Sequence, residues 1–204
     1  VGGAALLQEQ LKNLLLAANE NLKMIYTRIK ERDNDDDEYT EDVEEEEEEY
    51  TDEELLDEIN KALSALFKQT GSKFLSVFGN LAETTATFLN DDNTNIKLCG
   101  LCVVSDMLEH CGADSFNYKD MFAETIFTLL VSPHAGIRQA ALYAVGVAAQ
   151  HGGDRALANP YGEFCLTCLE PMFKMTQVPD ARADENINAT ENAVGSIAKI
   201  CHAF

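Results

Sequence analysis

The chain has 204 residues, 46% of them hydrophobic, which is enough to bury a substantial core as one domain or one short repeat array. Its formal charge is −21, but sixteen of the 36 acidic residues lie between Asp33 and Glu54, and setting these aside leaves only −5. No segment supplies the basic face that neutralises phosphates, which argues against direct binding to nucleic acid. No apolar run approaches the roughly 20 residues of a membrane span, and the N-terminal residues lack signal-peptide features, so we expect a soluble intracellular chain that binds no membrane.

Apolar residues recur at helical spacing along almost the whole chain, and no alternating strand pattern of useful length occurs. Pairs of breakers such as Thr70-Gly71, Cys111-Gly112 and Gly152-Gly153 mark plausible helix ends. The pattern predicts an all-α chain of about eight helices. First helices are expected over about 5–32, 72–90, 117–131 and 161–177, each followed by a second helix. For residues 1–32, one long helix and two shorter ones would give nearly the same pattern.

The second helices repeat one another. A shift of 41 residues places "NIKLCGLCVVSDMLEHCGAD" (95–114) on "GIRQAALYAVGVAAQHGGDR" (136–155). The same shift applied backward, and a further shift of 49, extend the pattern to four helices. The residues matched by these shifts include Ile96 with Ile137, His110 with His151, Gly112 with Gly153, Gly71 with Gly112 and Gly146 with Gly195.

Antiparallel helix pairs at a spacing of about 40–47 residues are typical of HEAT or armadillo repeats, in which stacking of neighbouring pairs completes the core. Residues 118–150 have the chemistry of one unit: Ser132-Pro133 makes the turn, Ile137 fills the junction, and Arg138 can reach a carbonyl or carboxylate across the turn. Small residues such as Ala144 and Gly146 allow the second helix to approach its neighbours closely. We therefore predict a right-handed HEAT-repeat superhelix of about four helix pairs. A compact four-helix bundle is the alternative, but it leaves the repeat register unexplained.

The predicted repeats cover approximately 5–70, 71–112, 113–153 and 158–203, and the acidic run, residues 33–51, is an insertion within the first. Its low hydrophobicity and high charge density predict a disordered, solvated loop. An anionic loop tethered beside a helical surface would also attract basic partners and raise their encounter rate. The candidate partner-binding residues of the insertion are Asp35, Asp36, Asp37, Glu38, Glu41, Asp42, Glu44, Glu45, Glu46, Glu47, Glu48 and Glu49.

Three stretches carry a resemblance to a known family: "LCVVSDMLEHCGADSFNYKDMF" (101–122), "RQAALYAVGVAAQHGGD" (138–154) and "ENINATENAVGSIAKI" (185–200). They resemble the importin-beta superfamily of nuclear transport receptors (karyopherins), and within it the importin-five or karyopherin beta-3 class. The resemblance implies a partial chain, because the receptors of this family are several times longer. It also implies reversible binding of partners instead of catalysis.

The resemblance implies specific partners: basic cargo (localisation signals, ribosomal proteins or histones), Ran-GTP and nucleoporin repeats, met as the protein shuttles between cytoplasm and nucleus. The second helices would line the concave side of the superhelix, where polar residues not used in packing become contact candidates, although ordinary solvated surface is an alternative for them. These candidates are Asp106, Glu109, Gln139, Gln150, Asn188 and Asn192. For the whole chain, a HEAT scaffold subunit and an acidic histone chaperone are the alternative functions.

Catalytic and metal chemistry finds little support in the sequence. Two Cys-x-x-Cys pairs, at 99–102 and 165–168, are separated by 62 residues, whereas the pairs of a zinc site are usually about 15–20 residues apart. A thioredoxin-type dithiol needs its first cysteine at a helix N-terminus within an α/β fold, whereas Cys99 falls inside a predicted helix, so small packing residues explain these cysteines better. We expect reduced thiols, buried for Cys102, Cys111 and Cys201, which fall in apolar helical patterns. No P-loop or Ser/His/Asp grouping occurs, and we expect no enzyme, no metal and no cofactor.

Overall fold

The computed structural model describes residues 2–35, 51–153 and 159–204, and within them the chain is helical with no strand, as predicted. The α-helices are α1 (Gly2–Asp35), α2 (Asp52–Thr70), α3 (Gly79–Leu89), α4 (Thr94–Cys111), α5 (Lys119–Leu129), α6 (Ala135–His151), α7 (Gly162–Thr176) and α8 (Ile187–Ala203). Two 3₁₀ helices, η1 (Gly71–Ser76) and η2 (Gly112–Tyr118), lead into α3 and α5. None of the described helices is both long and apolar enough to cross a membrane.

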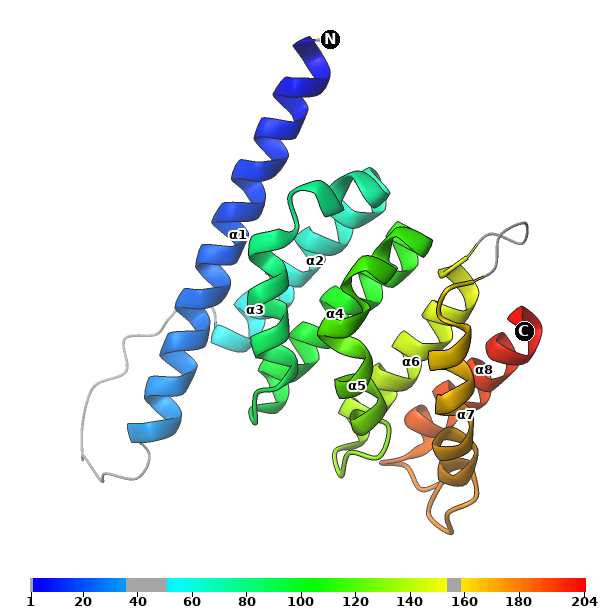
Figure 1. Ribbon diagram of the computed structural model, residues 1–204. Coiled ribbons are helices and arrows are strands. Elements are labelled where there is room, and N and C mark those ends of the chain that lie inside the picture. Colours follow the sequence, from blue (N-terminus) through cyan, green and yellow to red (C-terminus); the bar gives the residue numbers. More distant parts are fainter. Residues whose placement is uncertain (1, 36–50, 154–158) are drawn as a thin grey trace.

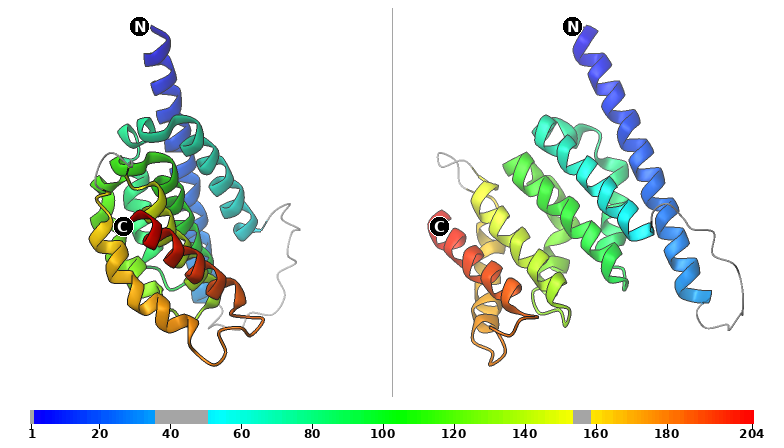
Figure 2. Two further views of the ribbon diagram at one scale, coloured as in Figure 1. Left: turned by 90° about the vertical axis from the view of Figure 1, so that its right-hand side faces the viewer. Right: turned by 180° about the vertical axis from the view of Figure 1, so that it is seen from behind.

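The helices form two stacked layers (Figures 1 and 2). Helices α2, α4, α6 and α8 lie side by side in one layer, which we call the second-helix layer, and each contacts the next. Helices α1, α3, α5 and α7 form the other layer. Because each pair packs mainly on its sequence neighbours, the arrangement is that of an α-solenoid and not of a four-helix bundle. Helix α1 is a single helix, and its N-terminal turns extend past the stack (Figure 1).

The repeat register has a structural counterpart at the C-terminal ends of α2 and α4. Gly71 and Gly112 end these helices with φ of +54° each, a left-handed conformation that residues with a Cβ rarely adopt. A Cβ on Gly71 would lie 3.3 Å from the carbonyl oxygen of His110, and one on Gly112 would lie 3.1 Å from that of His151. The predicted pairings of Gly71 with Gly112 and of His110 with His151 are therefore confirmed.

The end of α6 departs from this register. Gly152 is the C-cap residue and has a φ of −66°, and Gly153, the predicted match of Gly112, has no positive φ, so the left-handed turn seen at Gly71 and Gly112 is not repeated. The side chain of Asn159 replaces it: its Nδ2 donates hydrogen bonds to the carbonyl oxygens of Ala148 and Ala149, both at 3.0 Å. The carbonyl of Ala148 also accepts the backbone N–H of Gly152 at 3.0 Å, so the Asn159 amide and this N–H together cap the end of α6 without a left-handed glycine.

Helices α6 and α8 approach closely where their small side chains meet, as the sequence predicts. Ala141 and Ala144 are fully buried on α6, and Ser196 is buried on α8. The Oγ of Ser196 donates a 2.7 Å hydrogen bond to the carbonyl oxygen of Leu142. A Cβ on Gly146 would lie only 2.3 Å from that same Oγ, so glycine is what allows this approach.

The turn between α5 and α6 is organised by Arg138, as expected. Its Nη1 donates to the carbonyl oxygens of Ser132 at 2.7 Å and Pro133 at 2.9 Å, and its Nη2 donates to Oδ1 of Asn186. Ile137 fills the junction and is 4% exposed. One guanidinium therefore holds the turn of one predicted repeat and links it to the segment that precedes α8.

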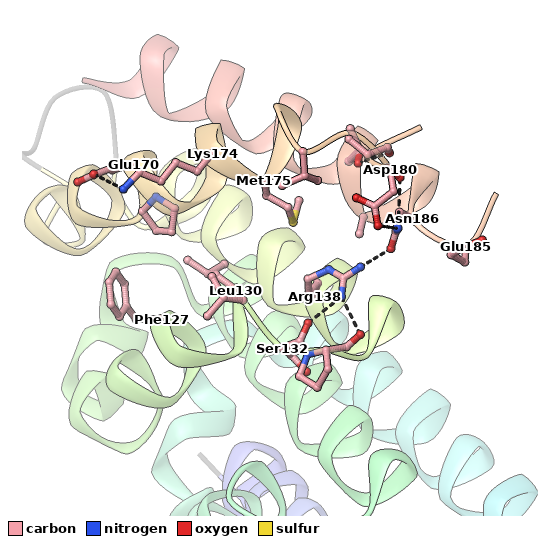
Figure 3. Close-up of a pocket in the computed structure, with 17 residues that line it drawn as sticks. Phe127, Leu130, Ser132, Arg138, Glu170, Lys174, Met175, Asp180, Glu185 and Asn186 are labelled. Atoms are coloured by element: carbon pink, nitrogen blue, oxygen red, sulfur yellow. Dashed lines mark hydrogen bonds and ion pairs between the residues drawn. The ribbon is translucent and has the colours of Figure 1, made fainter. Parts of the chain in front are cut away.

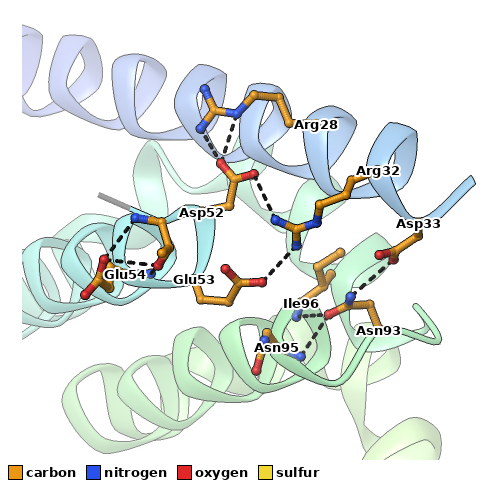
Figure 4. Close-up of polar contacts among 10 residues, drawn as sticks. Arg28, Arg32, Asp33, Asp52, Glu53, Glu54, Asn93, Asn95 and Ile96 are labelled. Carbon is orange, nitrogen blue, oxygen red and sulfur yellow. Dashed lines mark hydrogen bonds and ion pairs between the residues drawn. The ribbon is translucent and has the colours of Figure 1, made fainter. Parts of the chain in front are cut away.

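The acidic insertion is described only at its flanks, since residues 36–50 lie outside the described residues and the predicted loop stays a prediction. At the flanks, Nε of Arg28 donates to Oδ1 of Asp52 at 2.9 Å, and Nη2 of Arg32 lies 2.9 Å from Oε1 of Glu53 (Figure 4). Thr51 caps α2 through a capping box with the third residue of the helix. The acidic residues that directly follow the insertion, Asp52 to Glu54, are therefore helical and make defined contacts. The four repeat boundaries also stay a prediction.

The cysteines only partly match their predicted burial. Cys99, Cys111, Cys165 and Cys168 are buried free thiols, but Cys102 and Cys201 are exposed, so the prediction is wrong for these two. Cys102 lies on the face of α4 that lines the groove described below, a face that an apolar helical pattern does not distinguish. Burial raises the pKa of Cys99 to about 12, which is opposite to the lowered pKa of a reactive dithiol.

Candidate functional site

A groove of about 700 Å³ crosses all four helices of the second-helix layer. Three of the six residues predicted for partner contacts on these helices, Asp106, Gln139 and Asn192, line it. Helix α2 contributes Asp57, Asn60, Lys61 and Ser64, α4 contributes Leu98, Cys102, Ser105 and Asp106, α6 contributes Gly136, Gln139, Ala140 and Tyr143, and α8 contributes Asn192. Because consecutive repeats each supply one helix, an extended segment lying in the groove would contact several repeats at once.

Asp106 lies partly buried in this groove. Its Oδ1 accepts a 3.0 Å hydrogen bond from Oγ of Ser64, a neutral donor on the neighbouring helix α2. Burial raises the pKa of Asp106, and the bond from Ser64 opposes the shift without cancelling it. No ion pair joins Asp106 to a basic side chain among the described residues. The carboxylate is thus partly desolvated, and the charges that act on it from α4 are His110, which lowers its pKa, and Glu109, which raises it.

Glu109 lies one turn further along α4 and is already engaged. Its Oε2 accepts a 3.0 Å hydrogen bond from the hydroxyl of Tyr143 on α6. The Nζ of Lys199 on α8 lies 5.5 Å from the centroid of the Tyr143 ring, within the range of a cation–π contact. Tyr143 is 40% exposed and lines the groove, so an aromatic face stands beside the Asp106 carboxylate.

The remaining predicted contact residues differ in their placement. The Nδ2 of Asn192 donates a 3.2 Å hydrogen bond to the carbonyl oxygen of Gln139, so this pair links α8 to α6 as well as lining the groove. Gln150 is exposed beside a separate depression near the end of α6. Asn188 is exposed in the first turn of α8 and lies outside the groove. The structure therefore does not bring Gln150 and Asn188 together with the other four.

Several lining residues were not predicted, although the repeat register contained the signal. Positions 57, 98 and 139 are one register of 41 residues apart, and so are positions 61, 102 and 143; all six line the groove. Because equivalent positions of stacked repeats face the same side, every such series marks one stripe of the surface. Asp57 and Tyr143 were therefore predictable as groove residues from their places in these two series, although not from their polarity.

A second groove, of about 860 Å³, lies between the α5–α6 turn, α7 and the start of α8 (Figure 3). Phe127 and Leu130 give one end an apolar floor beside the Glu170–Lys174 ion pair, while Arg138, Asp180 and Asn186 line the other end. Pro171 also lines the groove. Phe127 is 40% exposed and Val131 67% exposed, so the apolar end is open to solvent. We call this the apolar groove.

The described residues contain no cluster of side chains that could bind a metal ion. No group of three or more His, Cys, Asp or Glu side chains gathers there closely enough to hold an ion. The described carboxylates that make close contacts instead pair with basic or neutral donor side chains, as Asp52 does with Arg28 and Glu109 does with Tyr143.

Comparison with known proteins identifies relatives of this chain. The model of the family "Importin repeat 6" matches residues 1–91. Importin subunit beta-3 of Saccharomyces cerevisiae is 35% identical over 204 residues, which is 100% of this chain and 18% of that protein. The chain therefore spans under a fifth of the length of this relative.

Solved karyopherins have the same arrangement of helices. The crystal structure of the karyopherin Kap121p bound to the SUMO protease Ulp1p matches 96% of this chain with a TM-score of 0.79 and 31% identity, over 17% of its own length. Kap121p bound to Nup53p gives a TM-score of 0.76 at 33% identity, again over 96% of this chain and 17% of its own length. These matches confirm the HEAT-repeat superhelix. They also confirm the resemblance found in the sequence: the chain is a partial-length relative of importin subunit beta-3 and belongs to the importin-beta superfamily of karyopherins.

Proposed function

We propose that this chain is a cargo-binding segment of a nuclear import receptor and that the groove over α2, α4, α6 and α8 holds lysine or arginine side chains of basic cargo. The observation that carries the proposal is Asp106, a carboxylate whose pKa is raised by burial and which accepts its hydrogen bond from a neutral hydroxyl, that of Ser64. A partly desolvated carboxylate gains most from a cation that enters its site. The Tyr143 ring beside it adds a face on which a second cationic side chain can lie.

The acidic run supplies a longer-range part of the mechanism. Its described ends lie in α1 and α2, where Arg28 pairs with Asp52 and Arg32 with Glu53, and we infer that the charge of residues 33–54 acts near the first repeat. Such a field raises the rate at which basic segments meet the groove and is screened by salt. Localisation signals, ribosomal proteins and histones have the required charge. Ran-GTP would displace the cargo, and the receptor would carry it between cytoplasm and nucleus.

The groove is tested by fluorescence anisotropy with a labelled Lys/Arg-rich localisation peptide. Asp106→Asn should weaken binding about tenfold, because it removes the charge while keeping the side-chain shape and the bond from Ser64. The matched control is Glu124→Gln, which removes one charge from the exposed surface of α5, outside the groove. Equal affinities of the Asp106→Asn and Glu124→Gln variants would reject the groove as the cargo site.

The insertion and Ran are tested in the same assay. Deletion of residues 36–50 should lower both the affinity and its dependence on salt, and Ran-GTP should release the peptide. An unchanged salt dependence after the deletion would remove the acidic run from the mechanism. Tight, salt-independent binding of a folded subunit would favour a HEAT scaffold, and capture of core histones with no response to Ran would favour an acidic chaperone.

Nucleoporin repeats are a second partner, and we assign them to the apolar groove. Its open end presents Phe127 and Val131 next to Pro171, a surface suited to aromatic side chains. Phe127→Ala should weaken binding of a phenylalanine-rich nucleoporin repeat peptide. Phe173→Ala is the control, because Phe173 is 60% exposed on α7 but does not line the groove. Equal losses in the two variants would show that the groove is not the docking site.

A further inference from the structure

Ser132-Pro133, in the turn between α5 and α6, is the one Ser-Pro or Thr-Pro step in the sequence; the other three prolines follow Asn159, Glu170 and Val178. The turn is a short non-helical segment on the surface. Val131 is 67% exposed, and Pro133 and His134 are also exposed. A serine directly followed by proline, outside a helix, is the minimal substrate of proline-directed protein kinases.

The surroundings of Ser132 already favour an anion on its hydroxyl. The backbone N–H of His134, at the start of α6, donates to Oγ of Ser132 at 3.3 Å, so this oxygen lies at the N-terminal end of a 17-residue helix. The positive end of the helix dipole stabilises negative charge there. This position alone would not define a phosphate site, but a basic side chain supplies a second contribution.

Arg138 wraps the same turn. Its Nη1 donates to the carbonyl oxygens of Ser132 at 2.7 Å and Pro133 at 2.9 Å, so the guanidinium lies directly against the residue that would carry the phosphate (Figure 3). Guanidinium and phosphate groups pair bidentately, and a phosphate opposite an arginine gains one to three charge-assisted hydrogen bonds. A small rotation of the Arg138 side chain would bring it onto a phosphate on Ser132.

We propose that Ser132 is a phosphorylation site for a proline-directed kinase, and that Arg138 and the N-terminus of α6 hold the phosphate. In the reaction, Oγ of Ser132 attacks the γ-phosphorus of ATP. The new O–P bond replaces the bond from the γ-phosphorus to its bridging oxygen, ADP leaves, and a base of the kinase takes the hydroxyl proton. The product carries close to two additional negative charges at neutral pH.

The modification would act on the apolar groove, since Ser132, Pro133 and Arg138 all line it. A hydrated dianion there would oppose docking of apolar side chains, and it would draw Arg138 away from Asn186, which precedes α8. This regulatory consequence rests on the proposed docking of nucleoporin repeats. The phosphorylation itself does not, so the two can fail separately.

The first test treats the intact chain with ATP and a recombinant cyclin-dependent kinase, followed by mass spectrometry. We expect one phosphate, located on Ser132, and none in Ser132→Ala or Pro133→Ala; the latter keeps the hydroxyl and removes only the recognised proline. Ser132→Thr should still be modified. Modification of the heat-unfolded chain but not of the folded chain would overturn the proposal, because the turn would then be inaccessible.

The second test asks whether Arg138 holds the phosphate. Phosphorus NMR of the phosphorylated chain follows the second ionisation of phosphoserine, whose pKa is usually about 6. The pKa should rise by roughly half a unit in Arg138→Gln and by less in Arg138→Lys, which retains the charge. Identical titrations of all three proteins would show that Arg138 does not contact the phosphate.

Discussion

The close approach of α6 and α8 predicts that alanine will have different effects on stability at two glycines in equivalent repeat positions. Gly146 of α6 faces α8, and a Cβ there would lie 2.3 Å from Oγ and 2.9 Å from Cβ of Ser196. Gly195 of α8 is exposed, and a Cβ there would meet nothing within 4 Å. The same substitution to alanine should therefore have opposite effects at the two positions.

The magnitudes follow from three contributions. Alanine is favoured over glycine in a helix by about 0.8–1.0 kcal/mol, and this gain applies at both sites. At Gly146 the added methyl group also overpacks a buried contact, at a cost of about 1–3 kcal/mol. Ser196 cannot rotate away without breaking its bond to Leu142, which would add about 1 kcal/mol or more. Gly146→Ala should thus destabilise the chain by about 2 kcal/mol, whereas Gly195→Ala should stabilise it by up to about 1 kcal/mol.

Thermal unfolding followed by circular dichroism checks both values. In a chain of this length, 1 kcal/mol corresponds to a shift in Tm of about 2–4 °C, so we expect a fall of roughly 4–8 °C for Gly146→Ala and a small rise for Gly195→Ala. Ser196→Ala in the Gly146→Ala background removes the closest atom and should recover part of the loss. A rise in Tm for Gly146→Ala would refute the inferred packing of α6 against α8.

Three further changes test the polar contacts. Asp106 has a raised pKa in the folded chain, so its folded form binds the proton more tightly and this group lowers stability as pH rises from about 4 towards that pKa; the Tm of the wild type minus that of Asp106→Asn should therefore fall between pH 4 and 7, and a constant difference would contradict the shift. Arg138→Ala removes two bonds to turn carbonyls and one to Asn186, and chemical denaturation should show a loss of about 2 kcal/mol, less in Arg138→Lys; a loss below about 0.5 kcal/mol would contradict the role of this arginine in the turn. Thr51→Ala removes the capping box with Glu54 and should lower the free energy of unfolding by about 1 kcal/mol, whereas Thr51→Ser should keep it, and equal values for the two variants would show that the cap contributes nothing.

Most of the structural features that could be predicted from the sequence follow from its repeat periodicity. The shift of 41 residues aligned Gly71 with Gly112 and His110 with His151. In the structure the left-handed turn at Gly71 lies against the carbonyl of His110, and the turn at Gly112 lies against that of His151, so the same contact recurs one repeat later. The role of Arg138 was also predictable, since a basic side chain just after a Ser-Pro turn has nearby carbonyls to bind. Contacts that recur in each repeat can therefore be predicted from a single sequence.

Features that break the repeat were not predictable. Asn159 caps α6 in place of a left-handed glycine, and nothing in the spacing of residues announces an amide eleven positions from its acceptor. Cys102 and Cys201 lie in apolar patterns but face outward, because packing in a solenoid leaves one stripe of each second helix uncovered. Polarity alone therefore selected Gln150 and Asn188, which lie outside the groove, and passed over Tyr143, which lines it.

Photo-crosslinking can show whether basic cargo lies in the groove of the second-helix layer. A Lys/Arg-rich peptide with a benzophenone group at its centre would be bound to the intact chain, irradiated, and its attachment points mapped by mass spectrometry. Crosslinks should fall on α2, α4 and α6 near Asp57, Asp106 and Tyr143, and should be lost in Asp106→Asn. Crosslinks confined to residues 33–54, or to α5 and α7, would contradict this account of how the protein binds its cargo.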